Sequence, residues 1–187
     1  MALAHRANEI QIEVDVYHWA MDDICEEAAR SVLSLPTTPP LVALIARIGL
    51  GLLAVHRDDV EEARQQYAAL ESTLPGIITA ELSGHRLLGL LSQTIGDLDD
   101  ATVHFEDALA FCHNTGCRPE QAWACSDYAE ALLQRNGPED RIKAMSLVED
   151  SLRLSNELGM PPLIERVAAI KQRIESQLQA APPIQTA

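Results

Sequence analysis

Two stretches of this chain, LGLLAVHRDDVEEARQQYAALESTLP at residues 50–75 and LGLLSQTIGDLDDATVHFEDALAF at residues 88–111, carry the same spaced pattern. In each, the glycine of Leu-Gly is followed by an alanine after twelve residues, an aromatic residue after sixteen, and a small or apolar residue after nineteen. Small residues at fixed places on two helices let the backbones approach, and a larger side chain there costs roughly 1–3 kcal/mol. The spacing therefore predicts a repeated pair of antiparallel helices. The positions that carry it are Leu50, Gly51, Ala63, Tyr67, Leu70 and Pro75, then Leu88, Gly89, Ala101, Phe105 and Ala108, with Ala144 in a weaker third copy.

The pattern resembles that of the tetratricopeptide repeat (TPR), a helix–turn–helix unit marked by Leu-Gly, Ala, an aromatic residue, Ala and Pro. The resemblance implies an all-α fold, a right-handed α-solenoid of antiparallel helix pairs, with about eight helices and a C-terminal capping helix. The spacing departs from the family, because Ala63 and Ala101 lie thirty-eight residues apart and the usual period is about 34. The alternative is a chance recurrence in a helical bundle rich in alanine and leucine.

A second resemblance rests on AWACSDYAEALLQRNGPEDRIKAMSLVEDSLRLSNELGM at residues 122–160, together with GDLDDATVHFEDALAF at residues 96–111. Both look like the C-terminal repeat region of large bacterial signalling ATPases, which also carry an NTPase core and either a class III nucleotide cyclase domain or a LuxR-type helix–turn–helix. This chain has no G-x-x-x-x-G-K-[ST] tract, no cyclase-sized α/β region and no basic recognition helix. The resemblance therefore carries over only the repeat array, either as a fragment of such a regulator or as a free-standing relative.

Proline, glycine and hydrophobic spacing divide the chain into a helical segment at 1–37, a repeat array with its capping helix at 38–178, and a tail at 179–187 that we expect to be disordered. Thr38 is the expected N-cap of the first helix of the array. No segment is expected to form a strand. The expected helices run over roughly 4–35 (as one or two helices), 41–56, 60–72, 78–95, 97–114, 119–135, 140–158 and 163–178.

The formal net charge of −14 makes nucleic-acid binding by this chain alone unexpected, because an acidic field repels phosphate backbones and anionic lipids. It favours a basic or neutral protein partner, or it serves solubility alone. The longest apolar run, from Leu41 to Val55, contains Arg47 and is shorter than the ~20 residues of a membrane span. With no basic start before an apolar core at the N-terminus, we expect no membrane association and a cytoplasmic location.

Three patterns in the sequence resemble a cofactor, metal or catalytic site, and each has a simpler structural explanation. Residues 49–54, GLGLLA, match the dinucleotide-binding spacing, but they lie inside a predicted helix and no strand precedes them. Cys112, His113, Cys117 and Cys125 have no zinc-site spacing, and we expect the four cysteines of the chain to be free thiols packed as small hydrophobes. The acidic cluster at Asp97, Asp99 and Asp100 is explained by helix capping. We expect no catalytic site, no metal and no cofactor.

In arrays of this kind the first helix of each pair lines a concave groove. The repeat register places in it Ile45, Ile48, Leu52, Val55 and His56, then Ser83, Arg86, Leu90, Gln93 and Thr94. The apolar members from the first helix are alternatively core beneath the N-terminal segment. Replacing Arg86 and Gln93 with alanine is expected to weaken binding and spare the fold.

The leading hypothesis is a non-catalytic protein–protein interaction scaffold of a bacterial signalling or regulatory system, with a partner peptide or domain in the groove. One alternative is a homodimerisation module of a transcriptional regulator or cyclase. Another is a small-molecule sensor domain with a pocket inside the superhelix.

Overall fold

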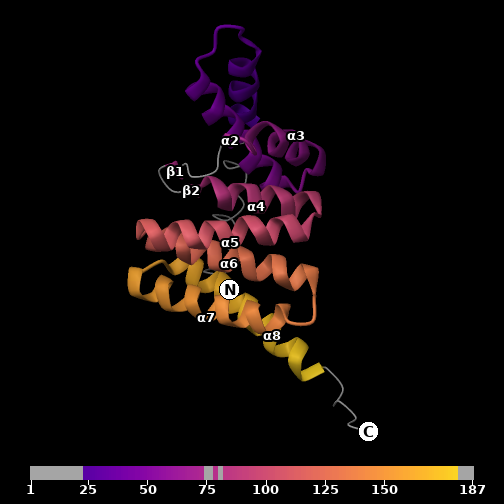
Figure 1. The fold of residues 1–187 in the computed structure, drawn as a ribbon, viewed down its shortest axis with the longest axis vertical. Coiled ribbons are helices and arrows are strands. Elements are labelled where there is room, and N and C mark those ends of the chain that lie inside the picture. The colour runs from indigo at the N-terminus through magenta and orange to yellow at the C-terminus, as the bar shows by residue number, and fades with distance from the viewer. Residues whose placement is uncertain (1–22, 74–77, 80–81, 181–187) are drawn as a thin grey trace, which may run out of the picture.

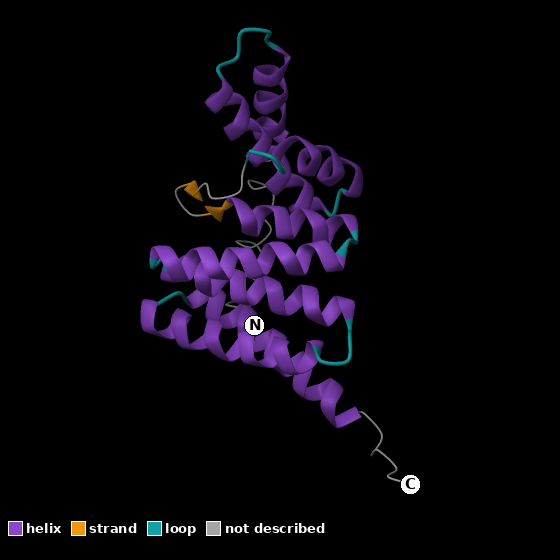
Figure 2. Ribbon diagram, in the orientation of Figure 1, coloured by secondary structure: helices purple, strands orange, loops and turns teal. Residues whose placement is uncertain are grey.

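A computed structural model describes residues 23–73, 78–79 and 82–180. Within them the chain is almost entirely helical (Figures 1 and 2), so the prediction of an all-α fold is confirmed. The predictions for residues 1–22, for Pro75 and for 181–187 lie outside the described residues. Residues 23–34 are helical, and the other elements are α2 (Pro40–Arg57), α3 (Val60–Leu70), β1 (Ile78–Thr79), β2 (Leu82–Ser83), α4 (Gly84–Ile95), α5 (Leu98–Thr115), α6 (Arg118–Arg135), α7 (Asp140–Leu158) and α8 (Pro161–Ala180).

The helices follow one another down the long axis of the molecule in chain order, from α2 and α3 at one end to α7 and α8 at the other (Figure 1). Each helix from α2 to α7 packs against the next one in the chain. A second set of contacts joins every other helix, α2 with α4, α4 with α6, and α6 with α8. The even-numbered helices therefore form a continuous row along the molecule.

Local residue chemistry explains most helix ends. Asp59 and Asp97 are N-caps whose carboxylates accept hydrogen bonds from the backbone N–H groups of Glu62 and Asp100, at 3.1 Å in each case. Gly96 and Gly159 end their helices in the left-handed conformation, with φ of 91° and 65°.

The structure corrects one expected cap. The Thr38 hydroxyl donates to the Val32 carbonyl at 2.5 Å, on the preceding helix, and the N-cap of α2 is Pro39.

The helix expected over 78–95 begins instead at Gly84, and the expectation of no strand is wrong at this place. Ile78 pairs with Ser83, and Thr79 with Leu82, in a short antiparallel hairpin. Ser83 has extended backbone angles, and its hydroxyl accepts from the Arg86 N–H at 3.2 Å as the N-cap of α4. The Ser83 N–H donates to Glu120 of α6 at 2.7 Å. This bond across thirty-seven residues holds Ser83 out of the helix.

The buried core has two parts, one between α2, α3 and α4 and the other between α5, α6, α7 and α8. Most of the repeat positions lie in it. The buried ones are Leu50, Gly51, Ala63, Leu70, Leu88, Gly89, Ala101, Phe105, Ala108 and Ala144, and Tyr67 is half-buried. Phe105 bridges the two parts, because its ring lies against Gly89 of α4 and stacks on Tyr128 of α6, with ring centroids 5.7 Å apart.

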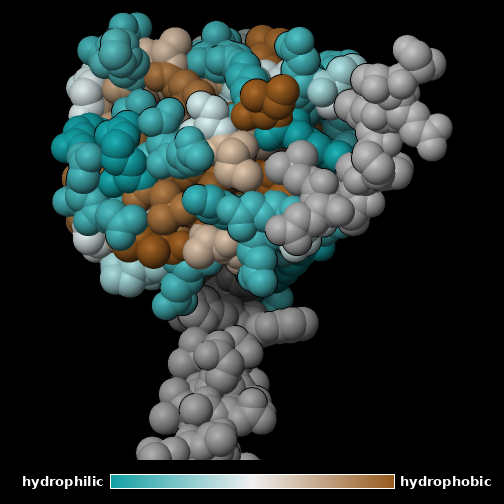
Figure 3. All heavy atoms as spheres, turned by 90° about the horizontal axis from the view of Figure 1, so that it is seen from below, coloured by the Kyte–Doolittle hydropathy of each residue, from teal (hydrophilic) through white to brown (hydrophobic). Residues whose placement is uncertain are grey.

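Helix α2 exposes much of its apolar surface. The exposed fractions of Leu41, Ile45 and Leu52 are 66%, 58% and 42%. Among the described residues α2 is also the one helix whose length and composition, with a mean hydropathy of 1.5, would allow it to cross a membrane. Core helices of soluble proteins meet the same criterion, and α2 packs against α3 and α4. The length and composition of α2 are therefore weak evidence for a membrane span. At the opposite end, Figure 3 shows hydrophobic patches divided by hydrophilic side chains.

Candidate functional site

A cleft of about 370 Å³ lies along the row of even-numbered helices. Gln93 of α4, Glu130, Leu133 and Gln134 of α6, and Arg173 of α8 line it. The Gln93 side-chain amide donates to the side-chain oxygen Oε1 of Gln134 at 3.2 Å, which links α4 to α6 at the surface. Three separate helices thus contribute to one polar surface with a single apolar member, Leu133.

Beside this cleft a chain of alternating charges connects the same three helices, and we call it the ion ladder. Arg86 of α4 contacts Glu120 at 2.9 Å and Asp127 at 2.6 Å, both on α6. Arg166 of α8 contacts the other oxygen of Asp127 at 2.7 Å and also pairs with Glu130. Arg173 then reaches Glu130 at 2.9 Å. The order along the ladder is Glu120, Arg86, Asp127, Arg166, Glu130, Arg173.

Burial and charge act against each other inside the ion ladder. Burial raises the pKa of Glu120, although Arg86 and the Ser83 N–H oppose the shift. For Arg86, burial works to lower the pKa, but the charges of Asp127 and Glu120 outweigh it and the pKa is raised. Trp123 lies between the two inner arginines, with its ring 5.5 Å from the Arg86 guanidinium and 5.8 Å from that of Arg166. The ladder is a fixed part of the fold.

Of the groove residues expected on α4, some lie at the surface and others lie in the interior of the protein. Leu90, Gln93 and Thr94 are half-buried, and Gln93 lines the cleft. Ser83 is buried as the helix cap. Arg86 is only 12% exposed and pairs with two buried carboxylates. The expectation that its replacement by alanine spares the fold is therefore revised.

On α2, the two residues left open between core and groove differ in burial. Ile48 is 7% exposed and belongs to the core, whereas Leu52 is 42% exposed. Ile45 and His56 are exposed, and Val55 is half-buried against the core. The exposed apolar members of the α2 set are Ile45 and Leu52, and the described cleft contains no α2 residue.

Sequence reasoning missed the α6 and α8 residues of the cleft. The offsets that gave the groove positions from Gly51 and Gly89 could have found those on α6. They would be applied to Ala129, since Tyr128-Ala129 can take the place of Leu-Gly ahead of Ala144. They give Trp123, Ser126, Glu130, Leu133 and Gln134, three of which line the cleft. Arg166 and Arg173 follow from no assigned repeat position, because they lie on α8, the expected capping helix.

A second polar cluster joins α3, α4 and α5. The hydroxyls of Tyr67 and Ser92 donate to the same Asp100 oxygen at 2.8 and 2.7 Å, and His104 lies 3.0 Å from the Tyr67 hydroxyl. Burial and the adjacent Asp100 raise the pKa of Tyr67. Because the Ser92 hydroxyl donates to the carboxylate and not to the histidine, the geometry is not that of a serine nucleophile with its base.

The cysteines were expected to be free thiols packed as small hydrophobes. All four described cysteines are free, and Cys112 and Cys125 are buried, as expected, while Cys25 is exposed. Burial raises the pKa of the Cys112 and Cys125 thiols to about 12, so both are protonated and poorly nucleophilic at neutral pH. Within the described ranges no three His, Cys, Asp or Glu side chains are arranged to hold a metal ion.

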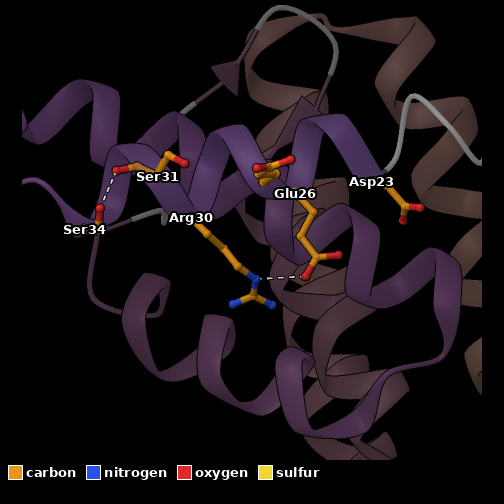
Figure 4. A pocket seen from close by; sticks show the side chains of 6 residues that line it. Asp23, Glu26, Arg30, Ser31 and Ser34 are labelled. Carbon is orange, nitrogen blue, oxygen red and sulfur yellow. Dashed lines mark hydrogen bonds and ion pairs between the residues drawn. The ribbon is translucent and has the colours of Figure 1, made fainter.

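A wider hollow of about 570 Å³ lies at the N-terminal helix (Figure 4). All of its lining residues come from the single stretch 23–34. Arg30 there is held by Glu26 at 2.8 Å and by Glu62 of α3 at 2.7 Å, and Ser34 bonds the Ser31 carbonyl. Among the described residues one helix face supplies the whole lining of the hollow, whereas three helices line the cleft, so the cleft is the stronger candidate.

Searches with the sequence and the structure found no matching protein-family model, no matching curated protein and no matching solved structure.

Proposed function

We propose that this chain is a non-catalytic protein-binding scaffold built as a TPR-like right-handed α-solenoid, with α2/α3, α4/α5 and α6/α7 as antiparallel pairs and α8 as the capping helix. Two features support this arrangement. Most of the spaced repeat residues are buried between the helices of these pairs. The even-numbered helices also contact one another in a row, as the first helices of stacked repeats do.

The observation that carries the binding role is the cleft shared by α4, α6 and α8. It offers amide groups from Gln93 and Gln134, the apolar Leu133, and charged groups on α6 and α8. Such a mixture suits an extended peptide, whose backbone takes hydrogen bonds and whose side chains take apolar and charged contacts. The partner would be a peptide or domain of another protein, and the setting a cytoplasmic bacterial signalling or regulatory system, as the resemblance implies.

A peptide library tests the proposal. The purified chain is incubated with an immobilised library of degenerate octapeptides, and the bound sequences are read out. The double variant Gln93→Ala/Gln134→Ala removes only exposed or half-buried amides, so it should keep its circular dichroism spectrum and lose most binding. Arg153→Ala, on the exposed surface of α7, is the matched control and should bind as the unmodified chain does. Failure to select any peptide, or equal binding by the double variant, would reject the cleft as the binding site.

A second candidate function, homodimerisation, is favoured by the exposed apolar surface of α2. Leu41, Ile45 and Leu52 recur at helical spacing on that helix and are exposed by 42–66%. Light scattering across a concentration series would show a dimer that Ile45→Lys disrupts. Ile142→Lys, on α7 at 77% exposure, should leave it intact. A mass that corresponds to a monomer at every concentration would exclude this function.

A further inference from the structure

Two cysteines lie on either side of the sharp turn between α5 and α6. The Cys112 carbonyl, in the last turns of α5, accepts hydrogen bonds from the N–H groups of Gly116 and Cys117, the second at 3.1 Å. Gly116 has a φ of 72°, so the chain reverses there in the left-handed conformation. The bond from Cys117 to the residue five positions earlier is the 6→1 bond of a Schellman motif, in which the side chains of those two positions commonly meet.

This turn brings the two thiols close together. Five residues of continuous helix would separate the Cα atoms of Cys112 and Cys117 by at least ~7.5 Å, which is more than a disulfide of ordinary geometry spans. The bond from the Cys117 N–H instead folds that residue back onto the end of α5. The thiols are also within electrostatic reach of each other. After burial and the charge of Glu120, Cys117 is the next cause of the raised pKa of Cys112.

The two thiols differ in their access to solvent. Cys112 is 1% exposed, and its raised pKa keeps it protonated. Cys117 is half-buried and is the N-cap of α6. Partly exposed cysteines at helix N-termini are the ones that react with oxidants, whereas buried cysteines are inert. Cys117 is therefore the thiol that meets an oxidant, and Cys112 is the thiol held behind it.

Cys125 is a less suitable partner for either thiol. It lies eight residues after Cys117 on α6, which separates the two Cα atoms by ~12 Å, beyond the reach of a disulfide. A bond between Cys112 and Cys125 would join two buried thiols whose pKa values are both raised to about 12. Neither of them would start the reaction with an oxidant, so the pair with one accessible thiol is Cys112 and Cys117.

We propose that Cys112 and Cys117, both free in the structure, are a redox-sensitive pair that closes to a disulfide when a hydroperoxide oxidises Cys117. The Cys117 sulfur attacks the O–O bond of the hydroperoxide, which gives a sulfenic acid on Cys117 and releases an alcohol, or water if the oxidant is hydrogen peroxide. The Cys112 sulfur then attacks the Cys117 sulfur, the S–S bond forms, and the sulfenic oxygen leaves as water. The pair loses two protons and two electrons, and the hydroperoxide takes them up.

The position of the pair determines which part of the fold the oxidation would affect. Glu120, three residues after Cys117, accepts from the Ser83 N–H and pairs with Arg86 of α4. A disulfide would fix the start of α6 to the end of α5, beside this buried end of the ion ladder. The modification site thus connects the redox state to the corner where α4, α5 and α6 meet, and it does not depend on the proposed binding role.

Mass spectrometry tests the proposal on the full chain, with hydrogen peroxide as the oxidant. Cleavage after glutamate gives a peptide of residues 107–120, which contains Cys112 and Cys117, and a peptide of residues 121–130, which contains Cys125. After oxidation the 107–120 peptide should be lighter by two hydrogen atoms, and a dithiol reductant should restore its mass. Cys25→Ser, the matched control at an exposed position, should give the same result.

Two variants separate the steps of the reaction. Cys112→Ala should leave a sulfenic acid on Cys117 that dimedone traps, whereas Cys117→Ser should leave Cys112 as an unmodified thiol. A melting curve close to that of the unmodified chain should show that each variant is folded. A 107–120 peptide that keeps both thiols under peroxide would reject the pair. A disulfide that joins the 107–120 peptide to the 121–130 peptide would also reject it, because the bond would then belong to Cys125.

Discussion

Gly51 and Gly89 hold the same place in the repeated pattern, but their surroundings differ. A methyl group on Gly51 would lie 3.6 Å from the nearest Leu91 carbon, which is ordinary contact. A methyl group on Gly89 would lie 3.0 Å from the ring of Phe105. That ring is fully buried and stacked on Tyr128, so it has little room to move.

We expect Gly51→Ala to stabilise the protein, by up to about 1 kcal/mol, because alanine is the better helix former. Gly89→Ala should destabilise it by roughly 1 kcal/mol, since overpacking outweighs the same helical gain. Urea unfolding followed by circular dichroism measures both, and each variant is the control of the other. Equal effects of the two substitutions would show that the Phe105 contact does not limit residue size at this position.

Arg86 gives a second prediction for a single residue. Arg86→Met should lower the free energy of unfolding by roughly 3–5 kcal/mol, because it leaves Glu120 and Asp127 buried with fewer partners. Chemical denaturation of the variant gives the value. Arg153→Met, which breaks only pairs on the exposed surface of α7, should unfold at nearly the original denaturant concentration. A similar small change for Arg86→Met would mean that water reaches the ion ladder.

For single residues, the sequence predicted which side chains pack in the core better than it predicted which charged side chains pair. Glycine, alanine and the aromatic residues act on neighbours within one helix pair, so their spacing in the chain reveals them. The partners of Arg86 lie thirty-four and forty-one residues away, and those of Arg173 and Arg166 lie on a different helix. Nothing local marks such a pairing, which is why Arg86 was predicted to face a ligand and instead binds buried carboxylates.

Among the elements, the turn between α6 and α7 depends most clearly on one ion pair. Asp140 accepts two hydrogen bonds from Arg135, at 2.6 and 2.9 Å, and one from the Gly137 N–H at 2.7 Å. Arg135 also reaches Asp99 and Thr102 of α5. A β-carbon on Gly137 would lie 2.8 Å from an Asp140 oxygen. The Arg135 guanidinium at the end of α6 therefore links α5, α6 and α7, and Asp140 holds it in place.

The stability supplied by Asp140 should depend on pH. The hydrogen bonds from Arg135 are the largest cause of the lowered pKa of Asp140, and burial opposes them. A carboxyl group whose folded pKa lies below its ordinary value stabilises the folded state above that ordinary value, and the contribution is lost as the pH falls through the folded pKa. Asp140→Asn should thus lose roughly 1–3 kcal/mol at neutral pH, and its stability should approach that of the unmodified chain in acid.

Thermal unfolding of both proteins between pH 7 and pH 2 would measure this. Asp150→Asn, whose partner Arg153 is exposed on the same helix α7, serves as the control and should show the same pH profile as the unmodified chain. A constant difference between Asp140→Asn and the unmodified chain across the whole range would show that the lost hydrogen bonds, and not the charge, account for the effect.

Helix boundaries show the limit of sequence reasoning at the scale of elements. Ends marked by glycine or by an N-cap aspartate, such as Gly96, Asp97 and Gly159, lie where the sequence predicts them. The start of α4 was predicted six residues too early, because its position depends on the bond from Ser83 to Glu120 on another helix. Local chemistry locates a helix end only when the residues that satisfy its backbone are themselves local.

For the molecule as a whole, the row-like packing predicts that stability is lost regionally. In a stack where each helix contacts only its near neighbours, an end cannot be held by the far side of the molecule. Helix α8 closes one end with Leu163, Val167, Ile170 and Ile174, all at most 1% exposed. Burial of four such side chains contributes roughly 6–12 kcal/mol, which is comparable to the ~5–15 kcal/mol that usually holds a whole domain folded.

We therefore expect Val167→Asp, which places a charge in this buried surface, to release α8 and expose the core of α5, α6 and α7. Hydrogen exchange followed by mass spectrometry should show the largest loss of protection in α6, α7 and α8. Helices α2 and α3, which have their own core with α4, should keep most of theirs. Ala169→Asp changes an exposed position on the same helix and should leave the exchange pattern unaltered. If Val167→Asp instead lowered protection equally from α2 to α8, the two parts of the core would unfold as one unit. The contact of Phe105 with Gly89 and Tyr128 would then couple the stack more strongly than its neighbour-to-neighbour packing implies.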